Sequence, residues 1–174
     1  GLKDDKTPGP SRLGPGRTTM NSPFQIRMAA PADAETIAAF NSAMSIETED
    51  IVLPQENALP GASAVLEDPS LGFYLIAETD GEVAGSLMIT YEWSDWSNAM
   101  YWWIQSVYVV PEQRRQGVYK TFYERVVSMA QEDGNVRGIK LYVSYGNESA
   151  QTTYESLGMH RSEHHIYEAS VWPG

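Results

Sequence analysis

Two arginines and a glycine stand where an apolar run ends and a helical pattern begins. The run Tyr101–Val110 is rich in aromatic and β-branched residues, and Pro111 closes it. The residues Arg114-Arg115-Gln116-Gly117 follow after Glu112 and Gln113. The first turn of a helix carries N–H groups without intrahelical acceptors and a partial positive charge, so a diphosphate would fit there between the arginines. Gly117 would let the backbone approach the phosphate oxygens closely.

A plain strand-to-helix turn with two solvated arginines is the alternative interpretation of this loop. The loop is not a nucleotide P-loop, because the pattern Gly-x-x-x-x-Gly-Lys-Ser/Thr is absent. The residues by themselves therefore predict only an anion site at the start of a helix.

A second group of residues lies downstream, after the next predicted strand. Asn147 or Ser149 can cap a helix in which Ala150, Tyr154 and Leu157 share one face. Taken alone, Tyr154 is best interpreted as a core or interface tyrosine of an amphipathic helix.

The elements that must position these residues follow from the hydrophobic periodicity and the turn residues. The predicted order is β-α-α-β-β-β-α-β-α-β, an α/β (α+β) mixed sheet covered by helices. Asp80-Gly81 predicts a hairpin turn, and Tyr101–Val110 is expected to be a central strand buried on both faces. The predicted strands are Phe24–Met28, Phe73–Glu78, Val83–Glu92, Tyr101–Val110, Gly138–Tyr145 and Met159–Ala169, with helices after Pro31, near Ala62–Glu67, from Val118 to Asp133 and after Asn147.

Length and composition limit the number of domains and the classes of protein that the chain can represent. The chain has 174 residues and 42% hydrophobic residues, which suits one domain over residues 20–174. Residues 1–19 are rich in Gly and Pro without apolar periodicity, and are expected to be a disordered tail or an added leader. The chain has no cysteine, which excludes disulfides and thiolate chemistry. No membrane span or secretory signal is visible, so a cytoplasmic location is the default expectation.

The charge is uneven. The formal net charge is -11, and no Lys or Arg lies between Arg27 and Arg114. This excess of acidic residues argues against nucleic-acid binding, which needs a broad basic face. It would suit a cationic substrate beside an anionic cofactor, although an acidic surface that only keeps the protein soluble explains it equally well.

The two motifs together resemble a known family. The run Val107-Tyr108-Val109-Val110-Pro111-Glu112-Gln113-Arg114-Arg115-Gln116-Gly117-Val118-Tyr119 is similar to the acetyl-CoA signature of the GNAT superfamily of N-acetyltransferases. That signature reads Arg or Gln, two residues, Gly, one residue, then Gly or Ala, so Tyr119 stands where the family has a small residue. Asn147, Ala150, Tyr154 and Leu157-Gly158-Met159 resemble a second family block, and the resemblance spans about Phe24 to Ala169.

The resemblance implies an enzyme that moves an acetyl group from acetyl-CoA to a primary amine of a small molecule or peptide, without a metal. Backbone N–H groups of a splayed central strand would bind the pantetheine and polarise the thioester carbonyl. Tyr154 matches the family's general acid, which protonates the leaving thiolate. The residues implied for cofactor binding are Val107, Tyr108, Val109, Arg114, Arg115, Gln116, Gly117, Val118, Tyr119, Lys120 and Asn147.

The acceptor amine must arrive neutral, so a base or a water relay is expected. Glu92, at the end of the third strand, is the first candidate for this base, with Asp95, Glu47 and Glu49 as others. A solvated surface carboxylate is the alternative interpretation of each.

The acceptor site of this fold would be formed by the acidic stretch Ser45–Gly61 and the turn Trp93–Asn98, which suggests a cationic amine. An aromatic cluster lies beside that turn. Core packing is its first interpretation, an amine pocket the second, and a homodimer interface would also use such residues. Its members are Tyr91, Trp93, Trp96, Tyr101, Trp102 and Trp103.

Two rival functions stay open. One is a non-catalytic acyl-CoA-binding or regulatory module on the same fold, and the other is transfer of an acyl group other than acetyl. The three histidines, His160, His164 and His165, lack acidic or cysteine partners at metal-ligand spacing and are interpreted as surface residues.

Overall fold

A computed structural model describes residues 22–172, and the predicted tail at residues 1–19 lies outside these described residues. The described chain forms two compact units that divide after Tyr142. The first unit carries the sheet and three α-helices, and the second carries one α-helix.

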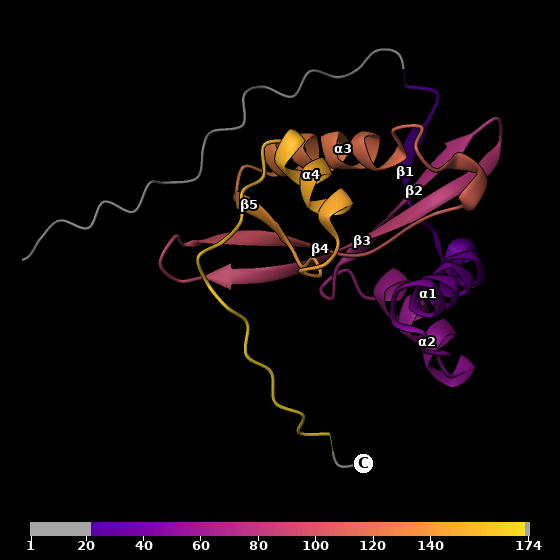
Figure 1. Cartoon of the computed structure of the whole chain (residues 1–174), viewed down its shortest axis with the longest axis horizontal. Coiled ribbons are helices and arrows are strands. Elements are labelled where there is room, and N and C mark those ends of the chain that lie inside the picture. Colours follow the sequence, from indigo (N-terminus) through magenta and orange to yellow (C-terminus); the bar gives the residue numbers. More distant parts are fainter. Residues whose placement is uncertain (1–21, 173–174) are drawn as a thin grey trace, which may run out of the picture. The chain divides into compact units, whose positions relative to one another are not determined.

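The first unit is built on one mixed sheet (Figure 1). Within residues 22–172 its strands lie side by side in chain order, and all neighbours are antiparallel except β4 and β5, which are parallel. This confirms the predicted mixed sheet. The strands are β1 (Gln25–Met28), β2 (Phe73–Thr79), β3 (Glu82–Ser94), β4 (Ala99–Val109) and β5 (Val136–Leu141).

The turn between β2 and β3 is the predicted hairpin. Asp80 and Gly81 both have positive φ, 50° and 78°. Two consecutive left-handed residues characterise the type I′ turn, whose twist matches that of the flanking strands. The register of β2 and β3 follows from this turn.

Helices cover both faces of the sheet (Figure 1). Helix α3 (Val118–Asp133) lies on one side, and α1 (Ala34–Glu49) and α2 (Gln55–Glu67) lie on the other. Buried residues of α1 and α2, including Ile37 and Ala62, pack with Tyr74 and Ile76 of β2. On α3, Val118, Phe122, Val126 and Ala130 are buried as their spacing predicts.

The acidic stretch Ser45–Gly61, which precedes the helix predicted near Ala62–Glu67, is itself largely helical. Helix α1 continues to Glu49 and α2 begins at Gln55, so only a short link separates them. Proline breaks most helix interiors, but Pro60 lies inside α2. The buried side chains of Ala58, Ala62 and Val65 hold this helix against its neighbours.

The prediction that Tyr101–Val110 is buried on both faces is wrong. Trp102 and Ile104 are buried, but the alternate residues Tyr101 and Trp103 are only partly covered and Gln105 is exposed. Helix α1 reaches this face of β4 further along, where Phe40 packs on Tyr108 at 4.9 Å between ring centroids. One face of β4 therefore stays open around Trp103.

An ion-pair network ties the start of α1 to the edge of the sheet. Arg27 on β1 donates from both terminal nitrogens to the carboxylate of Asp33, at 2.8 and 2.9 Å, and from Nε to Glu78 at 2.8 Å. The same carboxylate accepts from the N–H of Ala30. The Arg27 guanidinium beside it lowers the pKa of Asp33 below its ordinary value.

The second unit contains α4 (Glu148–Ser156). The side chain of Asn147 caps it by accepting from the N–H of Ala150 at 3.1 Å, as predicted. Gln151 donates to the carbonyls of Ser144 and Tyr145, which fixes the turn before the helix. Gly158 follows the helix with a φ of 90°.

The predicted final strand at Met159–Ala169 is wrong, because no strand forms between Met159 and Trp172. A strand needs a neighbouring strand to accept its backbone hydrogen bonds, and sequence alternation does not supply one. The apolar side chains Ile166 and Tyr167 are exposed. The strand predicted at Gly138–Tyr145 is β5, which ends earlier, at Leu141.

Candidate active site

The edge of β4 that faces β5 opens beyond Ile104. The β4–β5 ladder runs from Met100–Val136 to Ile104–Leu141, where β5 ends. On its other edge β4 stays paired with β3 as far as Val109. A bulge lies at the opening, because Leu87 pairs with Val107 while Ile89 pairs with Ile104. Such an extra residue bends a strand and increases its twist, which separates β4 from the direction of β5.

Two backbone N–H groups point toward this open edge. Val110 donates its N–H to Ala84 of β3, at 2.9 Å. Alternate residues of an antiparallel strand direct their N–H and C=O groups to opposite edges. The N–H groups of Val107 and Val109 therefore face away from β3, which is the direction in which β5 has ended. The splayed strand was predicted around Val107, Tyr108 and Val109, and the N–H of Tyr108 instead faces β3.

The loop after β4 leads directly into the first turn of α3. A 3-10 turn at Pro111–Gln113 is followed by Arg115 and Gly117, whose φ values are 62° and 84°. Gly117 is the N-cap residue of α3, and no side chain caps the helix. The first N–H groups of a helix, including those of Val118 and Lys120, have no intrahelical acceptor. This start of α3 is suited to bind an anion.

The start of α3 has room for a phosphate as well as a favourable charge. A Cβ built on Gly117 would meet nothing within 4 Å, so the backbone surface is open there. Arg115 and Gln116 are exposed beside it, and Gln116 donates to the carbonyl of Glu112 at 2.9 Å. The donor set of backbone N–H groups and an arginine fits a diphosphate.

Arg114 holds the loop rather than extending into solvent. Its Nε donates to the carbonyl of Val109 at 2.9 Å, and its Nη2 donates to Glu47 on α1 at 2.8 Å. The guanidinium also lies 5.5 Å from the ring centroid of Tyr108. The structure thus joins Arg114, a predicted cofactor residue, to Glu47, one of the carboxylates considered as a base.

Glu92, the first candidate for the base, lies on β3, opposite the first half of β4. It pairs in register with Tyr101, six positions before Val107, which is roughly 20 Å in an extended strand. Its carboxylate is ion-paired with Lys140 of β5. Glu92 would therefore act on an amine beside Val107 only through water.

Tyr154 lies on α4 in the second unit, seven residues after the capping Asn147. Burial raises the pKa of its phenol above the ordinary value. A raised pKa keeps the phenol protonated through neutral pH, which a proton donor requires.

The aromatic cluster divides between core and surface. Trp102 is buried and lies 5.3 Å from the ring of Phe73 in an edge-to-face arrangement. Trp96 in the turn after β3 is almost fully exposed. Trp103 lies on the opposite face from Trp102 and contacts Tyr142, with ring centroids 4.5 Å apart. Core packing is thus confirmed for Trp102 alone among these three.

Sequence reasoning missed Lys140. Its Nζ lies 4.1 Å from the ring centroid of Tyr101 and 5.6 Å from that of Trp103, as well as beside Glu92. The available signal was the alternation of Gly138, Lys140 and Tyr142, which places all three on one face of the strand.

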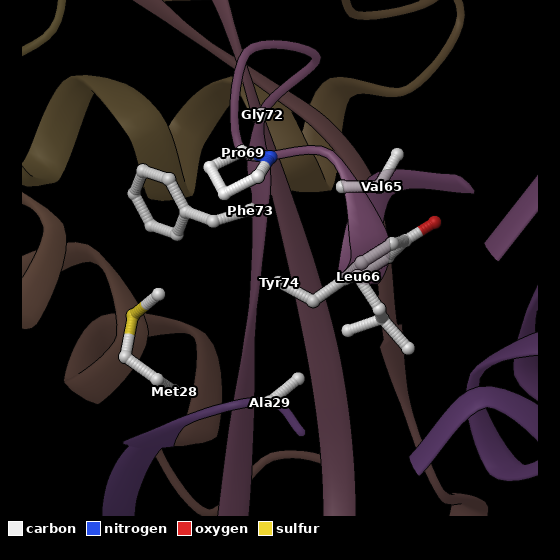
Figure 2. A pocket seen from close by; sticks show the side chains of 8 residues that line it. All are labelled: Met28, Ala29, Val65, Leu66, Pro69, Gly72, Phe73 and Tyr74. Carbon is white, nitrogen blue, oxygen red and sulfur yellow. The ribbon is translucent and has the colours of Figure 1, made fainter. Parts of the chain in front are cut away.

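A small apolar hollow of about 100 Å³ lies away from this edge, beside β1 and β2 (Figure 2). Met28, Leu66, Pro69 and Phe73 are among its lining residues. Its tyrosine, Tyr74, accepts a hydrogen bond from Asn41. Such a lining offers mainly hydrophobic contact.

Comparison with known proteins gives the class. Residues 35–159 match the Acetyltransferase (GNAT) family. A possible acetyltransferase from Clostridium difficile 630 superposes with a TM-score of 0.80 at 38% identity, over 85% of this chain and 97% of that one. The chain belongs to the GNAT acetyltransferase family.

More distant structures share the fold. An aminoglycoside N-acetyltransferase, AAC(6')-Iy, solved in complex with CoA, has a TM-score of 0.70 at 18% identity, over 89% of this chain and 99% of that one. A ribosomal-protein-alanine N-acetyltransferase from Brucella melitensis biovar Abortus 2308 has a TM-score of 0.68 at 17% identity, over 84% of this chain and 98% of that one. A search of curated proteins gives no significant match. In the part of the chain that the structure describes, no helix has the length and apolarity to span a membrane.

Proposed function

We propose that the protein transfers an acetyl group from acetyl-CoA to a primary amine. The observation that carries this proposal is the continuity of the open edge of β4 with the uncapped start of α3. Donors for a carbonyl, at Val107 and Val109, and donors for phosphates, at Gly117 to Lys120, belong to one short stretch of chain. A long ligand with a diphosphate at one end and amide and thioester carbonyls toward the other matches that order.

When bound, acetyl-CoA supplies an acetyl group activated as a thioester. The N–H groups of Val107 and Val109 would hold the pantetheine and polarise the carbonyl that the amine attacks. Arg115 and the first turn of α3 would hold the diphosphate, and Arg114 would keep the loop in place through Val109. Tyr154 would donate its proton to the sulfur as the C–S bond breaks. The amine's own proton would leave to solvent water.

Support for a catalytic rather than a purely binding role comes from family membership. An amine acceptor is further suggested by the acidic character of the chain between Arg27 and Arg114. N-acetyltransferases among the structures of similar fold agree with this choice of acceptor.

The test is incubation of the protein with acetyl-CoA and a panel of primary amines, with free CoA thiol and the acetylated amine both quantified. We expect thiol release that depends on both the protein and the amine. Tight acetyl-CoA binding without turnover of any amine would instead favour the non-catalytic binding module. Turnover only with a longer acyl-CoA would replace acetyl by another acyl group.

A further inference from the structure

A cation cage lies on the open face of β4 and β5. Its walls are the carboxylate of Glu92 and the rings of Tyr101 and Trp103, and its occupant is the ammonium of Lys140. The register brings these residues together, because Glu92 pairs with Tyr101 and Trp103 pairs with Lys140. One carboxylate and two aromatic faces are what an ammonium ion requires for binding.

The cage is shaped by a glycine as well as by its walls. A Cβ on Gly138 would lie 3.0 Å from Cε1 of Tyr101, which is too close for ordinary contact. The absence of a side chain at Gly138 therefore allows the Tyr101 ring to lie across β5, below Lys140. Trp103 is held in turn by its contact with Tyr142.

The internal ion pair is accessible to solvent. The side chains of Lys140 and Glu92 are 38% and 42% exposed. Ion pairs at such exposure contribute little net stability, because water screens them and the long side chains lose entropy. The ion pair by itself therefore presents no large barrier to exchange of Lys140, whose side chain is flexible, for an external ammonium.

The cage is too far from the proposed carbonyl site to hold the reacting nitrogen. Trp103 and Tyr101 lie four and six positions before Val107 on β4, so the cage is roughly 13–20 Å from the proposed carbonyl site along the strand. We propose that the cage binds a second ammonium of the acceptor, and that Lys140 fills it until the acceptor arrives. The acceptor class is then a diamine or polyamine with nitrogens roughly 13–20 Å apart. This assignment of the acceptor rests on the proposed acetyl transfer, whereas the cage itself does not.

The cage is tested first without any acetyl transfer. Butylammonium chloride is titrated into ¹⁵N-labelled protein, and the indole N–H of Trp103, assigned with Trp103→Phe, is followed by NMR. Removal of the internal competitor in Lys140→Met should tighten butylammonium binding about three- to ten-fold. Glu92→Gln in that background should abolish the gain. Lys140→Gln repeats the test with a polar replacement.

Arg137→Met is the matched control, since it removes one positive charge from the other face of β5, where Arg137 is exposed. It should bind butylammonium as the parent does. Equal or weaker binding by both Lys140 variants, or equal shifts with neutral butanol, would overturn the cage.

The acceptor class is tested by turnover. Dodecane-1,12-diamine spans about 17 Å between its nitrogens at roughly 1.3 Å per bond. Its kcat/KM should exceed that of dodecylamine at least ten-fold, and Glu92→Gln should remove most of this preference. Equal kcat/KM for the two amines would overturn the assignment of a dibasic acceptor. No turnover of any amine would overturn the proposed function, and the NMR titration would still decide the cage.

Discussion

The guanidinium of Arg114 lies 2.8 Å from the carboxylate of Glu47, which joins the loop before α3 to helix α1. The same guanidinium holds the carbonyl of Val109, at the open edge of β4. Through these two contacts Arg114 links the edge of β4, the loop before α3 and helix α1. Glu47 is thus a positioning residue for the cofactor loop in this account.

Replacement of Glu47 by Gln should therefore weaken acetyl-CoA binding modestly. Both side chains are about 42% exposed, so the pair should contribute less than about 1 kcal/mol. We expect a two- to five-fold increase in the acetyl-CoA Kd, measured by calorimetry, with the melting temperature nearly unchanged. Glu35→Gln removes a charge at the other end of α1 and should leave the Kd unchanged. An unaltered Kd for Glu47→Gln would exclude the positioning role.

The two ends of α3 offer a matched pair of glycine substitutions. Gly117 and Gly134 have φ values of 84° and 75°, and a Cβ on either would meet nothing within 4 Å. Alanine at each should cost a similar amount of stability, about 1 kcal/mol, because of the left-handed backbone. Only Gly117→Ala should also weaken acetyl-CoA binding, by ten-fold or more. Equal acetyl-CoA affinities for the two variants would contradict a phosphate site at Gly117.

Replacement of Tyr154 by Phe should lower kcat while leaving the acetyl-CoA Kd unchanged. General acid catalysis contributes about 10²- to 10⁴-fold, so a loss in that range is expected. Burial raises the pKa of Tyr154, so the wild-type enzyme should keep its proton donor beyond the pH at which an ordinary tyrosine ionises. The kcat profile against pH should accordingly fall only at strongly alkaline pH, and this limb should vanish in the variant. Tyr145→Phe, at an exposed position, is the control.

The Asp33 carboxylate should make the fold sensitive to acid. Its pKa is lowered in the folded protein, so its contribution to stability is present above the unfolded-state pKa of about 3.9. That contribution should be lost as the pH falls through the lower folded-state value. Asp33→Asn should reduce the free energy of unfolding at pH 7 by about 1–3 kcal/mol. Urea unfolding of both proteins between pH 7 and pH 2.5 should show that the difference in their free energies of unfolding decreases as the pH falls. A difference that does not change with pH would mean that Asp33 stabilises the fold by packing rather than by its charge.

Local signals in the sequence predicted much of the first unit. Asp80-Gly81 predicted a hairpin turn, and the spacing of Val118, Phe122 and Val126 predicted the buried face of one helix. Both features are determined by residues that are close together in the sequence. The first part of α2 was not predicted, since tertiary packing there outweighs the local preference of Pro60 against a helix interior. The alternation at Met159–Ala169 misled the prediction, because a strand also needs a partner that no local pattern reveals.

The candidate site divides in the same way. The loop at Arg114–Gly117 and the cap at Asn147 are local motifs and were predicted. The bulge opposite Leu87 and Ile89 and the contact of Arg114 with Glu47 depend on register and on residues distant in the chain. Lys140 was missed for this reason, because only the pairing of β4 with β5 places it over Tyr101 and Trp103.

The central claim is that acetyl-CoA lies along the open edge of β4 with its diphosphate at the start of α3. The most direct measurement is an NMR titration of ¹⁵N-labelled protein with acetyl-CoA, with backbone amides assigned. The largest shifts should fall on the N–H groups of Val107 and Val109 and on those from Gln116 to Lys120. Saturable shifts confined to other parts of the chain, or no shifts at millimolar acetyl-CoA, would contradict the account.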